Sequence, residues 1–195
     1  YSSMLLEGSF GELVPLVRDA VEKIFESSKR LVTMISDFMD ISNIESGDIK
    51  YDITKIDIKK IVLKLAEEMR TVARHSGVNL DVLIEDEDED AYKTLADMGK
   101  IRQVILSLMD NAIKYTPRGN VSALLALSQD KSKIVFSIAD TGIGMSEITM
   151  EKIFKKFSRA ESANKTYTEG IGLGLYVAKE IIKKPYFLGK PMVWA

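Results

Sequence analysis

A heptad pattern in residues 14–46 restricts the fold of this 195-residue chain more than any other feature. A set of eight positions, six apolar and two occupied by serine, alternates spacings of four and three, as the a and d positions of a coiled coil do. Those positions are Val17, Val21, Ile24, Ser28, Leu31, Ile35, Phe38 and Ser42. Pro15 suits the first turn of a helix and Gly47 suits its end. We therefore predict one long helix whose apolar edge, here called the heptad seam, packs against another helix.

The segment ahead of this helix, YSSMLLEG (residues 1–8), resembles the tail of a second helix joined through GSFGEL. Together the two segments predict a helical hairpin within a first domain, residues 1–50. So regular a seam favours a bundle formed across a dimer; the alternative is a surface helix on one monomeric core. Because Tyr1 begins inside an apolar run without an initiator Met, we interpret the chain as a piece of a longer protein.

The composition of the chain excludes several kinds of function and site. The chain is 46% hydrophobic and 29% charged, which is typical of a soluble globular protein. Its net charge of -2 gives no bulk attraction to nucleic acid or to an anionic membrane, so we expect no nucleic-acid partner. The absence of cysteine excludes disulfides and thiolate metal sites and fits a cytoplasmic location. No apolar run approaches the length of a membrane span, so membrane attachment would require other parts of a parent protein.

Residues 51–195 predict a second domain of mixed strands and helices. Asp97 is a plausible N-cap for its central helix, and Gly77 a plausible end for the helix before it. The expected elements are strands at 51–57, 78–84, 92–97, 121–128 and 133–139 and helices at 58–75 and 99–115. With an antiparallel pair at 121–139, this order predicts an α+β two-layer sandwich.

Two features of this domain have simple structural explanations. His75, the only histidine, falls in the last turn of the helix at 58–75, where histidine usually caps carbonyl groups, so we expect no catalytic role for it. The acidic run EDEDED (residues 85–90) lacks the spacing and the central glycine of an EF-hand calcium loop. We interpret it as a solvated turn.

The helix at 99–115 carries a polar edge. Its core stripe contains Ile101, Val104, Ile105, Leu108 and Ala112. At about 100° per residue, Ser107, Asn111 and Lys114 cluster within roughly 60° of one another beside that stripe. A hydroxyl, an amide and an ammonium group therefore line one edge of a mostly buried helix. A solvated face, with Lys114 extended over it, is the alternative.

Two glycine-containing segments follow. In ADTGIGM (residues 139–145), Asp140 lies at the end of an apolar strand, where Gly142 and Gly144 allow a sharp turn and a close approach to a ligand. A simple turn beginning with Asp is the alternative. In GIGLGL (residues 170–175), glycines precede an apolar helix, which suggests a phosphate cradle. Its spacing matches neither the dinucleotide-binding motif nor the P-loop.

Taken together, the motifs DNAIKYT, DTGIGM, IFKKF and GIGLGL closely resemble, in this order, the ATP-binding domain of sensor histidine kinases. They are similar to the N, G1, F and G2 boxes of the Bergerat ATP fold, which gyrase, Hsp90 and MutL share. The resemblance implies a mixed sheet with helices on one face. The preceding helical segment, with DFMDISNIESG, resembles the second half of the family's dimerisation and phosphoacceptor hairpin.

The resemblance implies that ATP and Mg2+ are the ligands. Asn111 matches the Mg2+-binding residue: a hard cation takes oxygen ligands, and an amide adds no charge beside the triphosphate. Lys114 and Tyr115 match residues that reach phosphate and ribose. Asp140 matches the residue that reads adenine, because its carboxylate accepts from the exocyclic amine, whereas guanine presents an oxygen there.

The glycines, and the long connection from Met145 to Glu169 that we interpret as a lid, also have implied roles. Gly142 and Gly144 give the base room. Backbone N–H groups of the G2 box would meet the phosphates at the start of a helix; this set is Gly170, Gly172, Leu173 and Gly174.

Four further residues lie on the lid side. Phe154 and Phe157 resemble the F-box pair, which packs the lid; we count Phe157 among the nucleotide-binding residues. Arg159, and more weakly Lys165, match positions that contact the γ-phosphate. Asn111, Lys114 and Arg159 are the residues expected to support phosphoryl transfer.

The chain departs from the family pattern at three places. The phosphoacceptor histidine should precede YSSMLL and is not in this chain. The N box usually carries another Asn where this chain has Ser107, which weakens one polar contact near the nucleotide. After the G2 helix, KKPYFLGKPMVWA allows one strand at most, so the C-terminus is truncated or divergent.

The leading hypothesis is the catalytic core of a sensor histidine kinase in a two-component pathway. Such a core forms a homodimer through its hairpin, transfers the γ-phosphoryl group of ATP to a histidine, and passes it to the receiver domain of a response regulator. This fragment alone is not expected to autophosphorylate. The alternative is a degenerate or truncated fragment that binds nucleotide or dimerises without transfer. Another Bergerat ATPase is disfavoured because the heptad hairpin lies immediately ahead of the domain.

Overall fold

The computed structural model describes residues 1–47, 51–86, 88, 90–158, 172–183 and 190–194. The chain divides into two compact units, Tyr1–Asp48 and Ile49–Ala195. Among the described residues, no helix combines the length and the apolar composition that crossing a membrane requires.

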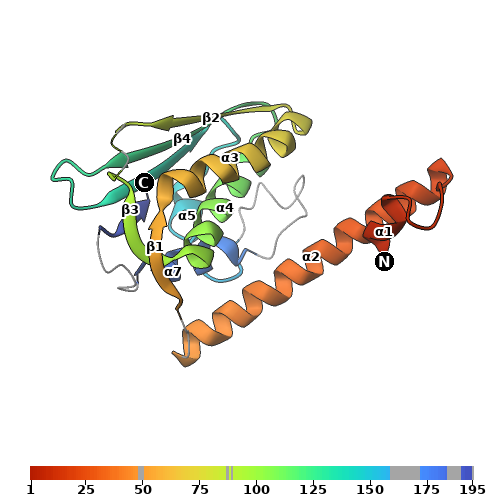
Figure 1. The fold of residues 1–195 in the computed structure, drawn as a ribbon, viewed down its shortest axis with the longest axis horizontal. Helices are drawn as coiled ribbons and strands as arrows, with labels where there is room; N and C mark the ends of the chain where they lie inside the picture. Colours follow the sequence, from red (N-terminus) through yellow and green to blue (C-terminus); the bar gives the residue numbers. More distant parts are fainter. Residues whose placement is uncertain (48–50, 87, 89, 159–171, 184–189, 195) are drawn as a thin grey trace. The chain divides into compact units, whose positions relative to one another are not determined.

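The first unit consists of a short helix α1 (Ser2–Leu6) and a long helix α2 (Pro15–Ser46) (Figure 1). Pro15 occupies the first turn of α2, and Gly47 ends the helix in the left-handed conformation at φ 76°. The Arg18 guanidinium donates to the Leu6 carbonyl at 3.4 Å, which joins the two helices. The predicted helical segments are therefore present, with α2 running 32 residues without a break.

Most of the heptad seam of α2 is exposed within its own unit. Ile24, Leu31, Ile35 and Phe38 are 58%, 59%, 61% and 65% exposed. Of the residues of α2, only Val21 and Ile41 are buried. Such a row of large apolar side chains is costly to leave in water, since each contributes about 1.5–3 kcal/mol when it is fully buried.

The second unit alternates strands and helices. Its elements are β1 (Ile53–Asp57), α3 (Ile58–His75), β2 (Val78–Ile84), β3 (Lys93–Asp97), α4 (Met98–Lys114), β4 (Gly119–Leu127), β5 (Ile134–Asp140), α5 (Glu147–Met150), α7 (Gly174–Lys183) and β6 (Met192–Trp194). Side-chain caps fix two helix starts, because Asp57 and Asp97 accept hydrogen bonds from the amides of Lys60 and Lys100.

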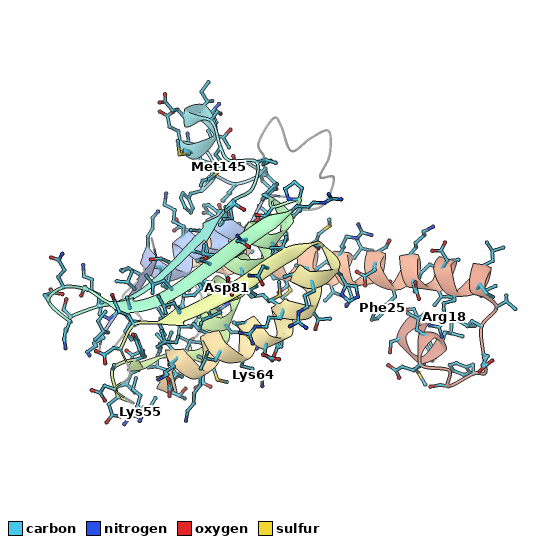
Figure 2. All side chains as sticks on the ribbon, turned by 90° about the horizontal axis from the view of Figure 1, so that it is seen from above. Arg18, Phe25, Lys55, Lys64, Asp81 and Met145 are labelled. Atoms are coloured by element: carbon cyan, nitrogen blue, oxygen red, sulfur yellow. The ribbon has the colours of Figure 1, made fainter. Side chains whose placement is uncertain are left out.

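Four strands form one mixed sheet in the order β2-β4-β5-β6. The pairs β2–β4 and β5–β6 are parallel, and β4–β5 is antiparallel. Helices α3, α4 and α7 cover one face of this sheet, and Figure 2 looks onto its open face, where Asp81 lies. The predicted α+β two-layer sandwich, with a mixed sheet and helices on one face, is confirmed.

The core lies between the sheet and its helices. The side chains of strand β4 alternate between buried and exposed, as expected for a strand with one face on the core. The buried residues are Val121, Ala123 and Leu125, and the exposed ones are Asn120 and Ser122. Opposite them, α4 buries Val104, Ile105 and Met109 completely. The predicted core stripe of this helix is confirmed.

The two short strands β1 and β3 do not belong to this sheet. β1 and β3 pair with each other in an antiparallel two-stranded sheet, apart from the four-stranded one. Tyr92, just ahead of β3, is buried and donates to the Leu125 carbonyl at 3.0 Å, which ties this ribbon to β4. Thr94 of β3 donates to the carbonyl of Lys190, near the C-terminus of the chain, at 2.9 Å.

Candidate functional site

The polar edge of α4 lies at the border of the core. Ser107, Asn111 and Lys114 are each half-buried, and each lies about one helical turn from the next. The Asn111 side-chain Nδ2 donates to the Ser107 carbonyl oxygen at 2.7 Å. Because an amide is planar, this bond turns its Oδ1 oxygen away from that carbonyl. Asn111 therefore presents an oxygen as the outward group of its side chain.

A chain of hydrogen bonds runs from Asn111 to Asp140. The Tyr115 amide donates to the Asn111 carbonyl at 3.0 Å, and the Ile143 amide donates to the Tyr115 carbonyl at 3.0 Å. The Gly142 amide then donates to Asp140 Oδ1 at 2.9 Å. The end of α4 and the turn after β5 are thus joined through backbone groups, and one carboxylate oxygen of Asp140 is held by its own turn.

The two glycines of this turn, Gly142 and Gly144, have different structural roles. A Cβ on Gly142 would overlap the Tyr115 carbonyl oxygen and would lie 2.8 Å from Asp140 Oδ1. Gly144 has nothing within 4 Å of such a Cβ, but its φ of +65° is one that side chains rarely adopt. Gly142 is therefore required for the approach to α4 and Gly144 for the bend that follows.

Thr141 is a residue of this site that the sequence analysis missed. Its hydroxyl accepts from the Asn120 amide at 3.0 Å, and the Thr141 amide donates to the Asn120 carbonyl at 3.1 Å. Gly119 packs so closely that a Cβ there would overlap the Thr141 hydroxyl. These contacts fix the start of the Asp140 turn on β4. No local pattern in the sequence indicates this pairing, because Asn120 is 21 residues away from Thr141.

The described part of GIGLGL lies against α4 and against the end of the F-box segment. Leu173 is buried at 2% exposure, and its carbonyl accepts from the Val177 amide at 2.9 Å to begin α7. A Cβ on Gly172 would overlap the Ser158 carbonyl, and one on Gly174 would lie 2.8 Å from the Ser107 hydroxyl. Of this predicted set, Gly170 lies outside the described residues.

The F-box segment packs on α7 through paired aromatic and cationic side chains. Lys179 lies over the Phe154 ring at 5.3 Å, and Lys156 over the Tyr176 ring at 5.1 Å. Phe157 is 62% exposed and has a positive φ of 58°. The structure therefore separates the F-box pair: Phe154 faces α7, and Phe157 is available to another surface.

The other residues that the sequence singled out do not all lie in this arrangement. Arg159 and Lys165 lie outside the described residues. Lys114 is placed with its ammonium 5.7 Å from the Tyr115 ring centre. His75 Nδ1 lies 2.7 Å from the Thr71 carbonyl, as expected for a residue that caps the end of α3. Within the described ranges, no group of three or more His, Cys, Asp or Glu residues could hold a metal ion.

The hairpin that carries Asp140 is closed by a charged turn. Ser128 and Ser132 donate to the Asp130 carboxylate at 2.6 and 2.7 Å. These hydrogen bonds favour the ionised form and lower the pKa of Asp130 to about 2. The turn therefore keeps its hydrogen bonds throughout the neutral range and fixes the register of β4 and β5.

Comparison with known proteins identifies the fold of this site. Residues 96–190 match the family described as histidine kinase-, DNA gyrase B-, and HSP90-like ATPase. The circadian input-output histidine kinase CikA of Synechococcus elongatus is 28% identical over 93% of this chain and 24% of its own length. The signal transduction histidine-protein kinase BarA of Escherichia coli is 30% identical over 89% of this chain and 19% of its own. The chain thus spans about a quarter or less of these relatives.

Solved structures agree on the fold. Full-length ShkA, in a crystal structure with AMPPNP, has a TM-score of 0.71 and 24% identity over 93% of this chain and 36% of that protein. The Acinetobacter baumannii histidine kinase AdeS has a TM-score of 0.64 and 20% identity over 93% of this chain and 81% of that protein. Residues 96–190 are thus similar to the family of histidine kinase-, DNA gyrase B- and HSP90-like ATPases, and the solved structures agree with this fold.

Proposed function

We propose that this chain is the ATP-binding catalytic core of a sensor histidine kinase. One observation carries the proposal: three motifs far apart in the sequence converge on the second half of α4. Asn111 lies on that helix, the Asp140 turn is bonded to its end, and Gly174 at the start of α7 packs against Ser107. The family match and the AMPPNP complex of ShkA support an adenine nucleotide as the ligand.

Asn111 has a side chain suited to binding the Mg2+ ion that accompanies such a nucleotide. Mg2+ is usually held by one or two protein oxygens together with phosphate oxygens and water, so a dedicated cluster of acidic residues is not needed. The bond from Nδ2 to the Ser107 carbonyl leaves Oδ1 as the outward donor atom, which is the type of ligand that Mg2+ takes. When bound, Mg2+ would neutralise charge on the phosphates.

Asp140 would read the base. Its Oδ1 accepts from the Gly142 amide, which fixes the plane of the carboxylate and leaves Oδ2 as the atom that faces a ligand. A carboxylate oxygen accepts from the exocyclic amine of adenine, whereas the oxygen of guanine would leave two acceptors opposed. Leaving such polar groups unpaired costs about 1–3 kcal/mol each.

The start of α7 and Lys114 would hold the phosphates. The first N–H groups of a helix have no partner within the helix and favour anions. Lys114, in the last turn of α4, would supply a positive charge beside them. Phosphoryl transfer needs mainly positioning and neutralisation of charge from the protein. In the transfer itself, an imidazole nitrogen would form a bond to the γ-phosphorus with its lone pair. The bond to the bridging oxygen breaks, and ADP leaves with those electrons.

The acceptor and the partners lie outside the described site. His75 caps α3 and is not the proposed acceptor. The exposed heptad seam of α2 supports a homodimer in which a histidine-bearing helix completes the bundle. A response regulator would then receive the phosphoryl group. The name of the relative BarA, a signal transduction histidine-protein kinase, supports this step. A cytoplasmic location follows from this proposal, because ATP and response regulators are found there.

Phosphoryl transfer is tested with a chain to which a phosphoacceptor helix is added ahead of Tyr1. Incubation with Mg2+ and γ-labelled ATP should give label that acid removes and base does not, the behaviour of phosphohistidine. The matched control replaces the added histidine with glutamine. If the added helix remains unlabelled while the nucleotide binds, the chain is a nucleotide-binding fragment without transfer.

A further inference from the structure

The last pair of residues between β4 and β5 is closed by a side chain in place of a backbone carbonyl. Val121 lies opposite Asp140 in the register of the two strands, so the next pair is Asn120 with Thr141. The Thr141 amide donates to the Asn120 carbonyl at 3.1 Å, which marks this as a hydrogen-bonded pair. In such a pair the Asn120 amide donates in return to the opposite backbone carbonyl. Here it donates to the Thr141 hydroxyl instead, at 3.0 Å.

This substitution separates the last hydrogen bond of the sheet from the path of the chain. Because the hydroxyl supplies the acceptor, the backbone can turn out of the sheet at Thr141 while its bond to β4 remains. The hydroxyl also donates to the Asn120 carbonyl at 3.4 Å. Threonine suits this position, because its branched Cβ restricts the rotation of the side chain and keeps the oxygen beside Asn120.

The turn after β5 is therefore anchored on both sides of Gly142. Thr141 bonds to β4, and the amide of Ile143 donates to the Tyr115 carbonyl at the end of α4 at 3.0 Å. Asp140 lies directly before the first anchor, and its Oδ1 accepts from the Gly142 amide between the two anchors at 2.9 Å. The position of the Asp140 carboxylate thus depends on where the chain leaves the sheet.

We propose that Thr141 is a positioning residue for base recognition. The oxygen on its side chain sets where the chain leaves β5, and so places the Asp140 carboxylate that would read adenine. This inference rests on the proposed function, since base reading by Asp140 is part of it. Without the side-chain oxygen, the Asn120 amide bonds to the backbone carbonyl of residue 141. That carbonyl then rotates into the ladder and moves Gly142 and the Asp140 carboxylate with it.

The test is a double-mutant cycle in which the affinity for ADP is measured by calorimetry in the presence of Mg2+. Thr141→Val keeps nearly the same shape and removes the oxygen. It should weaken binding by roughly threefold to tenfold, which is part of what a hydrogen bond to a charged group contributes. In an Asp140→Asn background the same change should cost less than about twofold, because the hydrogen bond that Thr141 positions is already lost. Thr141→Ser retains the oxygen and should bind within about twofold of the wild type.

Thr94 provides the matched control. Its side chain is buried, and its hydroxyl donates to the Lys190 carbonyl at 2.9 Å. Thr94→Val is the same substitution and also removes one hydroxyl hydrogen bond, but none of the three motifs of the nucleotide site includes Thr94. It should lower the unfolding temperature at least as much as Thr141→Val, because Thr141 is exposed, and it should leave ADP affinity unchanged. If Thr141 contributed only to stability, affinity would follow the unfolding temperature in both variants.

The outcomes separate this inference from the proposed function. A wild-type chain that binds no adenine nucleotide overturns both. If the wild type binds ADP and Thr141→Val binds it equally well, the positioning role of Thr141 alone is overturned. The same holds if the loss is as large in the Asp140→Asn background, or if Thr141→Ser binds as weakly as Thr141→Val. If Thr141→Val does not fold, Thr141→Ala, which also lacks the oxygen, replaces it in the cycle and is judged by the same comparisons.

Discussion

The Ile143 amide donates a 3.0 Å hydrogen bond to the carbonyl oxygen of Tyr115, and this bond attaches the turn after β5 to the end of α4. Gly142 makes the bond possible, because any side chain at that position would overlap the same carbonyl. Since Asn111 and Asp140 lie at the two ends of this connection, a change in the turn should affect the metal ligand and the base reader together.

Gly142→Ala should therefore weaken nucleotide binding both with and without Mg2+, and it should lower the free energy of unfolding by about 1–3 kcal/mol through overpacking. The control is Gly144→Ala. At Gly144 a Cβ meets open space, and only the left-handed backbone opposes it, at a cost of about 1 kcal/mol. Calorimetry and urea unfolding of both variants provide the comparison. Equal losses in the two variants would show that contact with Tyr115 is unimportant.

Asn111→Ala should remove the Mg2+ dependence of nucleotide binding while the domain remains folded. The variant loses the outward Oδ1 ligand and one hydrogen bond to the Ser107 carbonyl, the latter worth about 1 kcal/mol. Asn79→Ala is the matched control, because Asn79 is an exposed residue of β2 that bonds to Asp81. Titrations of ADP with and without Mg2+ measure the effect. An unchanged dependence on Mg2+ in Asn111→Ala would refute the metal assignment.

Asp140→Asn should reduce the preference for adenine over guanine. The amide oxygen can still accept from the Gly142 amide, but the outward group becomes a donor, which matches the oxygen of guanine better than the amine of adenine. We expect ADP affinity to fall by roughly tenfold to a hundredfold, the equivalent of a hydrogen bond to a charged group. Asp81→Asn, on the open face of the sheet, is the control. An unaltered ratio of ADP to GDP affinity in Asp140→Asn would remove Asp140 from base recognition.

Local features of the sequence were enough to predict most elements of the fold. The period of α4 separates its buried stripe from Ser107, Asn111 and Lys114. Asp97 caps that helix and Gly77 follows the end of α3 with a φ of 73°, as their positions indicated. These signals depend on neighbouring residues only, so a single sequence contains them.

Contacts between distant segments were not predictable in the same way. The pairing of β1 with β3 joins residues about forty positions apart, and no local pattern distinguishes it from membership of the larger sheet. The contact of Gly174 with Ser107 and the role of Thr141 depend on how helices and strands pack in three dimensions. In GIGLGL, the sequence indicated a phosphate cradle but not which residues of the protein the glycines approach.

Ile35→Asp should convert a dimer into a monomer if the heptad seam of α2 forms the proposed bundle. Ile35 is 61% exposed within its unit and lies between Leu31 and Phe38 on the seam. A charge in a buried helical interface is strongly unfavourable. Ser36→Asp introduces the same charge about 100° around α2 from Ile35, off the heptad seam, and should leave the dimer intact. Light scattering after size-exclusion chromatography gives the mass. A monomeric wild-type chain contradicts the dimer.

The most direct test of the central claim is calorimetric titration of the wild-type chain with ADP and with GDP, in the presence of Mg2+. If the site formed by α4, the Asp140 turn and the start of α7 binds an adenine nucleotide, ADP should bind with a measurable heat and GDP should not. Equal affinity for the two nucleotides, or no binding of ADP, would contradict this account.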